Sequence, residues 1–304
     1  MCEGVTHLAA NLLLCILEMQ HTGANTSCWV GYICGVKHVV DAVGNVEPSS
    51  GTDASLILGW VFYFDVMSRM TNRHWRTEHI EAVAEGLGYI SDGSTGCKLQ
   101  YIRARTLFAR GVSDIANHAH PIVRLLAEVS ETAMFSSDPR YLTNEYQQNL
   151  DDLRFRLENV STRRVLLAGS AQDTPEHIQS LLGLTRLAGL IYLERVSRSF
   201  SGQSAKIDSW TQQALAILAR LDSCFCPFAL LVVSCETSQD EDRMIILDLF
   251  ARMEKQPHLQ SLLEAKALIQ TAWNQQDLAE GEGLEYIHKI NVVLSSREAV
   301  PSLI

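Results

Sequence analysis

Apolar residues recur at helical spacing along most of the chain. Leu8, Leu12 and Ile16 fall on one stripe near the start, and Leu56 and Trp60 begin another stripe in an aromatic-rich segment. A period of 3.6 residues places such positions on one side of an α-helix. The same pattern predicts helices over 5–19, 29–43, 53–71, 101–135 with a break near 120–121, 141–160, 174–198, from 208, 244–253 and 257–273.

Strand signals are short and isolated, at residues 165–167 and 292–294. No stretch rich in proline, glycine or serine divides the chain, and 304 residues correspond to one large or two small domains at ~150 residues per domain. We therefore expect an all-α protein with a single multi-helix domain of roughly nine helices over residues 1–304. Residues 72–100 are expected to form a loop region.

Composition narrows the functional classes. The formal net charge of −10 argues against a broad DNA-binding surface. Eight cysteines without a Cys-x-x-Cys pair indicate reduced thiols and no structural zinc site. The apolar run at residues 8–17 is too short to span a bilayer, which takes ~20 residues, so no membrane attachment is expected. No motif for a cofactor or a metal stands out.

An enzyme remains one alternative. A helical domain with an apolar pocket can bind a hydrophobic metabolite and catalyse its cyclisation or rearrangement, using one or two placed acids. The acid/base candidates for such a site are His118, His120, Glu128 and Glu131. A structural domain without any ligand is a further alternative.

Several sequence motifs together resemble those of one protein family. Residues 12–19 with Trp29, the aromatic segment 59–67 and residues 120–130 follow one another in a characteristic order. The most specific stretch is 226–236, with Arg243 and Trp273 further on. This order is similar to that of the helical regulatory domain of fungal binuclear zinc-cluster transcription factors. The resemblance covers about residues 5–290, with 72–100 matching poorly.

The resemblance implies a function in transcription regulation, including that of secondary-metabolism genes, in the nucleus or cytoplasm. It implies homo- or heterodimers with related transcription factors and a small hydrophobic effector. The family's six-cysteine zinc cluster is missing from this sequence, so no direct nucleic acid binding is expected. The match starts almost at Met1, so the N-terminal helices of the family fold are expected to be absent.

Seven residues carry the family motifs. Five of them are expected to be packing or buried polar residues, and a buried carboxylate needs a charged partner. We therefore predict that Asp65 and Glu236 pair with arginines such as Arg69 or Arg243, and that Arg243→Ala destabilises the fold. The family-motif residues are Trp60, Asp65, Pro227, Cys235, Glu236, Arg243 and Trp273, of which Pro227 and Cys235 have no assigned role.

Overall fold

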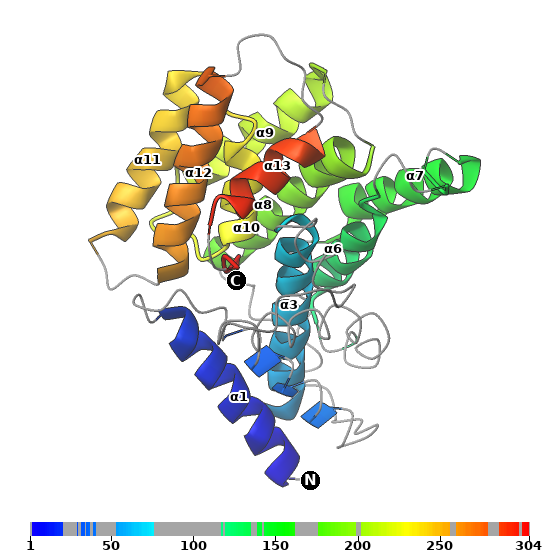
Figure 1. Cartoon of the computed structure of the whole chain (residues 1–304), viewed down its shortest axis with the longest axis vertical. Helices are drawn as coiled ribbons and strands as arrows, with labels where there is room; N and C mark the ends of the chain where they lie inside the picture. The colour runs from blue at the N-terminus through cyan, green and yellow to red at the C-terminus, as the bar shows by residue number, and fades with distance from the viewer. Residues whose placement is uncertain are drawn as a thin grey trace, which may run out of the picture. The chain divides into compact units, whose positions relative to one another are not determined.

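The described part of the chain is helical throughout. The structure, a computed structural model, describes residues 2–20, 53–75, 117, 119–134, 139–141, 143–161, 176–198, 202–255, 260–278, 286–297 and 300–303, and single positions between 29 and 40. These residues contain no strand, which confirms the predicted all-α class (Figure 1). None of the described helices has the length and apolar character needed to cross a membrane.

The described residues form ten α-helices and one π-helical turn, slightly more than the nine helices predicted. The short strand signal at 292–294 does not form a strand, because these residues lie inside the last helix, in line with the predicted all-α class. The loop predicted over 72–100 begins too early, because residues 72–74 belong to the helix Asp53–His74. The rest of that region from residue 76 and the other strand signal, at 165–167, lie outside the described residues. The elements are α1 (Cys2–Gln20), α3 (Asp53–His74), α6 (Pro121–Thr132), α7 (Asn144–Asn159), α8 (Glu176–Tyr192), the turn η2 (Leu193–Ser197), α9 (Ala205–Leu218), α10 (Pro227–Ser234), α11 (Asp240–Met253), α12 (Gln260–Leu278) and α13 (Tyr286–Ser295).

The chain divides into two compact units. Unit 1 contains residues 1–120, 259–261 and 294–302, and unit 2 contains residues 121–258, 262–293 and 303–304. Whether residues 1–304 fold as the single domain expected from the sequence stays a prediction.

Unit 1 joins the first part of the chain to its last residues. Helices α1 and α3 pack on each other, and Cys15 on α1 is fully buried. The Trp29 indole N–H donates to the Val300 carbonyl oxygen at 3.2 Å, and that of Trp75 donates to the Arg297 carbonyl oxygen at 3.3 Å. Two tryptophans that are distant in sequence therefore fix the C-terminal segment in unit 1.

Helix α3 confirms one predicted pairing and corrects one packing prediction. Asp65 is fully buried and its carboxylate lies 2.6 Å from Arg69 Nη2, one turn further along the helix. Trp60, expected to be a packing residue, is 56% exposed. The buried stripe in this half of the helix runs through Leu58 and Val61 instead, which turns Trp60 to the opposite side.

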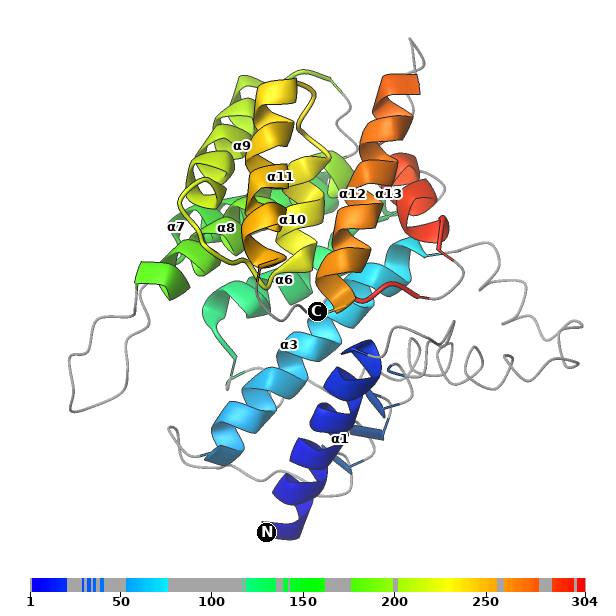
Figure 2. The same ribbon diagram turned by 90° about the vertical axis from the view of Figure 1, so that its left-hand side faces the viewer.

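Helix α8 is the centre of unit 2. It packs against α6, α7, α9 and α10, as Figures 1 and 2 show. The second half of α8 is almost entirely apolar and buried, from Leu184 to Tyr192. Gly189 allows α6 to approach, because a Cβ atom at this position would lie 2.7 Å from Leu126 Cδ2. A helix enclosed in this way is apolar on nearly all sides, as the sequence shows.

Candidate ligand-binding cavity

Unit 2 contains a cavity of about 550 Å³ between η2, the end of α10, α12 and α13. Small-molecule sites in proteins have volumes of roughly 300–1,000 Å³. Aliphatic side chains from α12 and α13 form much of its wall: Ala272, Leu278, Ile290, Val292 and Val293.

The polar side of the cavity contains a buried ion pair. The Arg195 guanidinium donates to both Glu236 carboxylate oxygens, with Nε–Oε1 at 3.1 Å and Nη2–Oε2 at 2.7 Å. The side chains are only 10% and 6% exposed. Arg195 also donates to the Gly202 carbonyl oxygen at 2.7 Å. These contacts fix the guanidinium in one orientation, because its donors form a rigid planar fork.

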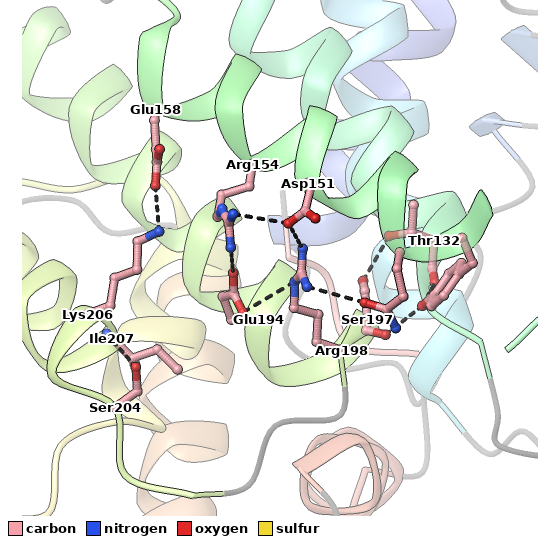
Figure 3. Close-up of polar contacts among 12 residues, drawn as sticks. Thr132, Asp151, Arg154, Glu158, Glu194, Ser197, Arg198, Ser204, Lys206 and Ile207 are labelled. Carbon is pink, nitrogen blue, oxygen red and sulfur yellow. Dashed lines mark hydrogen bonds and ion pairs between the residues drawn. The ribbon is translucent and has the colours of Figure 1, made fainter. Parts of the chain in front are cut away.

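The π-helical turn positions Arg195. The turn closes with a bond from Arg198 N–H to the Leu193 carbonyl oxygen, five residues earlier. Such turns are rare and occur frequently at functional sites. On the side of α6 and α7, the Ser197 hydroxyl lies 2.8 Å from that of Thr132, and Arg198 pairs with Asp151 at 2.6 Å (Figure 3). One short segment thus connects the cavity wall to two further helices.

One buried polar atom beside the cavity, Gln276 Oε1, lacks a hydrogen-bond partner among the described residues. The Tyr286 hydroxyl faces the Glu236 carboxylate and the Cys235 thiol. Burial, and then the charge of Glu236, raises the pKa of Tyr286 well above its ordinary value. The Arg195 guanidinium lies over the Tyr286 ring, 5.6 Å from its centroid. Gln276 uses its amide nitrogen, which donates to the Cys235 carbonyl oxygen at 2.5 Å.

The cysteine in this wall is not prepared for nucleophilic chemistry. Burial, and then the charge of Glu236, raises the pKa of Cys235 to about 12. The thiol therefore stays protonated at neutral pH, and only the thiolate is a good nucleophile.

The other motif residues hold α10, α11 and α12 together. Arg243 pairs with Asp277 at 2.7 Å and lies 5.4 Å from the centre of the Trp273 indole ring. The Trp273 N–H donates to the Ser234 carbonyl oxygen at 2.9 Å. Pro227 is the first residue of α10, where a missing N–H costs nothing.

The predicted pairing of Glu236 with Arg243 is wrong. Glu236 follows α10 and faces η2, where Arg195 is closer, whereas Arg243 on α11 faces α12. Sequence reasoning missed Arg195, although an arginine between the apolar residues Leu193 and Val196 was a usable signal. Nothing in the sequence pointed to Tyr286 or Gln276.

The structure does not gather the acid/base candidates at the cavity. His118 lies outside the described residues, and His120 directly precedes α6. Glu128 and Glu131 are exposed on α6, and Glu128 binds Arg156 at 2.6 Å. Within the described ranges, no three His, Cys, Asp or Glu side chains are grouped as a metal site.

Fold and cavity together define an all-helical domain with a mixed apolar and polar pocket. The sequence model of the fungal specific transcription factor domain matches residues 2–291, and the chain belongs to this family. It is similar to the transcription factor iacI of Pestalotiopsis fici, with 27% identity over 302 residues, which are 98% of this chain and 72% of that protein. No solved structure matches the chain.

Proposed function

We propose that this fungal transcription factor domain regulates gene expression in the nucleus by binding a small effector in the cavity of unit 2. The observation that carries the proposal is the cavity itself, about 550 Å³ with an aliphatic wall and a fixed ion pair. A largely apolar pocket with a few oriented polar groups is the usual form of a small-molecule site.

A reporter assay tests this function. The chain is fused to a heterologous DNA-binding domain in a fungal host, and reporter output is compared across growth media. Ala272→Phe fills the cavity from its buried wall, and Val292→Trp narrows it from a half-exposed position where folding is easily kept. We expect both variants to lose the dependence on medium.

Gln270→Trp is the matched control, since Gln270 is exposed on the same helix as Ala272 and does not line the cavity. This variant should respond like the wild type. A full response by both cavity variants would contradict the proposed site.

Direct DNA contact is not part of this proposal. A net charge of −10 opposes the phosphate backbone, which supplies most of the non-specific affinity of DNA-binding proteins. Gel-shift titrations of this chain at physiological salt should show no specific complex. A tight sequence-specific complex would overturn this part of the proposal.

Dimerisation with a related transcription factor chain is a second proposal, and α1 supports it. Leu13, Leu14 and Leu17 are all substantially exposed, Leu13 by 66%. Leu17 lies four residues from Leu13 and three from Leu14, which places these side chains on one side of the helix. Sedimentation velocity of this chain mixed with a related transcription factor chain should show a dimer. The double variant Leu13→Glu with Leu17→Glu should leave the two chains as monomers. If the wild-type chain stays monomeric in such mixtures, the dimerisation proposal is contradicted.

A further inference from the structure

The turn η2 makes different contacts on its two sides. On one side, Arg195 lines the cavity and pairs with Glu236. On the other side, the Ser197 hydroxyl lies 2.8 Å from that of Thr132, and the Ser197 carbonyl oxygen accepts from the Tyr146 hydroxyl. Because Arg195 and Ser197 are so close in sequence, the conformation of this turn decides whether both sets of contacts exist together.

Four charged side chains close a ring between η2 and α7 (Figure 3). The Arg198 guanidinium lies 2.6 Å from the Asp151 carboxylate and 3.4 Å from that of Glu194. The Arg154 guanidinium lies 3.0 Å from the same aspartate and 3.4 Å from the same glutamate. The Asp151 side chain is 55% exposed, and ion pairs at such positions contribute little to stability. The ring therefore holds the end of the turn on α7 weakly enough to open while the protein stays folded.

The wide turn allows Arg195 and Arg198 to face different helices. Positions three apart lie on one side of an α-helix. In η2, the Arg198 N–H instead bonds to the Leu193 carbonyl oxygen, five residues back, so each residue turns through a smaller angle. Arg195 consequently reaches Glu236 while Arg198 reaches Asp151. In α-helical register the end of the turn would rotate by up to roughly 100°, the step of one α-helical residue, and one of the two pairs would be lost.

We propose that η2 is a two-position switch that couples the cavity to α6 and α7. An effector that draws Arg195 away from Glu236 removes one of the two pairs that hold the wide turn. The turn then adopts α-helical register, and Arg198 leaves Asp151. The trigger rests on the proposed effector function, whereas the coupling is a property of the protein alone. By linkage the coupling acts in both directions, so loosening the contacts on α7 also loosens the cavity wall.

Two neighbouring aspartates of α7 test the coupling from the side of the ring. Asp151 and Asp152 have similar exposure, 55% and 61%. Asp151 pairs with Arg198 of η2, whereas Asp152 lies 3.4 Å from Arg156 of α7 itself. Arg195 contacts the Tyr286 ring on α13, so exchange of backbone amide hydrogens in α13 reports on the cavity wall.

Hydrogen exchange of the full chain is followed by mass spectrometry. Asp151→Ala should speed exchange in α13 by about two- to fivefold, the change expected from losing a partly exposed ion pair. Asp152→Ala is the matched control and should leave α13 like the wild type. Helix α11 is the internal reference, because a general loss of stability speeds exchange in all helices alike. Unchanged exchange in α13, or the same acceleration in α11, would overturn the switch.

Glu236→Gln tests the reverse direction, because it weakens the acceptor of Arg195 at nearly constant side-chain volume. Exchange in α7 should rise more than in α11, although α11 begins at Asp240, close to Glu236 in sequence. In the double variant with Asp151→Ala, exchange in α7 should match that of Asp151→Ala alone, since Arg198 is already released.

Effects of the two substitutions that multiply would show independent sites and overturn the switch. Asp151 lies at the surface, so its variant keeps the proposal falsifiable even where Glu236→Gln does not fold. The reporter assay decides the effector function separately, and a failed coupling leaves that function standing.

Discussion

The Arg195–Glu236 pair sets the polar end of the cavity. Both side chains are largely removed from water, and each satisfies the other through two-point contacts. Forming such a pair in a protein interior gives little net stability, because both charges must be desolvated. Removing one partner is different, since the other charge is then left buried alone.

We therefore expect Arg195→Ala to lower the free energy of unfolding by about 3–5 kcal/mol. Arg156→Ala is the matched control, because Arg156 makes an equally close pair with Glu128 at the surface, where such pairs contribute about 0–1 kcal/mol. Urea denaturation followed by circular dichroism measures both. Equal small losses would contradict the burial of the Arg195 pair.

Tyr146 gives a second test of how much a single side chain contributes to stability. Its hydroxyl shares one proton between the carbonyl oxygens of Thr132, at 2.8 Å, and Ser197, at 2.5 Å. Tyr146→Phe leaves both buried acceptors without this donor, so we expect a loss of about 1–3 kcal/mol. A thermal melting temperature equal to that of the wild type would show that the bond contributes nothing to folding.

Among the elements, α8 depends on close packing at one point. Its apolar second half is enclosed by neighbouring helices, and α6 approaches at Gly189. Leu126, the residue that faces Gly189, is itself fully buried and has little room to move. The two glycines of α8, Gly183 and Gly189, therefore differ in whether the surrounding side chains leave room for a Cβ atom.

Gly189→Ala should destabilise the protein by about 1–3 kcal/mol, because the added methyl group overpacks the contact with Leu126. Gly183→Ala should stabilise it by up to about 1 kcal/mol, since a Cβ atom there lies 3.6 Å from Ile217 and alanine favours the helix. Chemical denaturation of the two variants provides the comparison. Stabilisation by both would contradict the tight α6–α8 approach.

For the whole molecule, buried thiols set an alkaline limit to stability. Burial raises the pKa of Cys15 and of Cys235 to about 12, and it also raises that of Cys224, from an ordinary value of 9.0. A raised pKa in the folded state means that the stabilisation is fully present below pH 9.0 and is lost as the pH rises toward the folded value.

The free energy of unfolding in reducing buffer should therefore fall above about pH 9, by up to ~1.4 kcal/mol per pH unit for each thiol. Cys235→Ala removes one such group and should show a shallower decline between pH 9 and 11. The difference in the free energy of unfolding between Cys235→Ala and the wild type should stay constant between pH 7 and 8. Parallel curves at alkaline pH would contradict the burial of the Cys235 thiol.

The sequence by itself determined the helical class, most helix positions in unit 2 and the family, because apolar periodicity and short motifs are local properties. The Asp65–Arg69 pair was also within reach, since its members lie one helical turn apart. Only the tertiary structure decided that Glu236 binds Arg195, 41 residues away, and that Trp60 faces solvent. Partners across such separations depend on how helices pack, and a one-dimensional pattern does not record which face meets which neighbour.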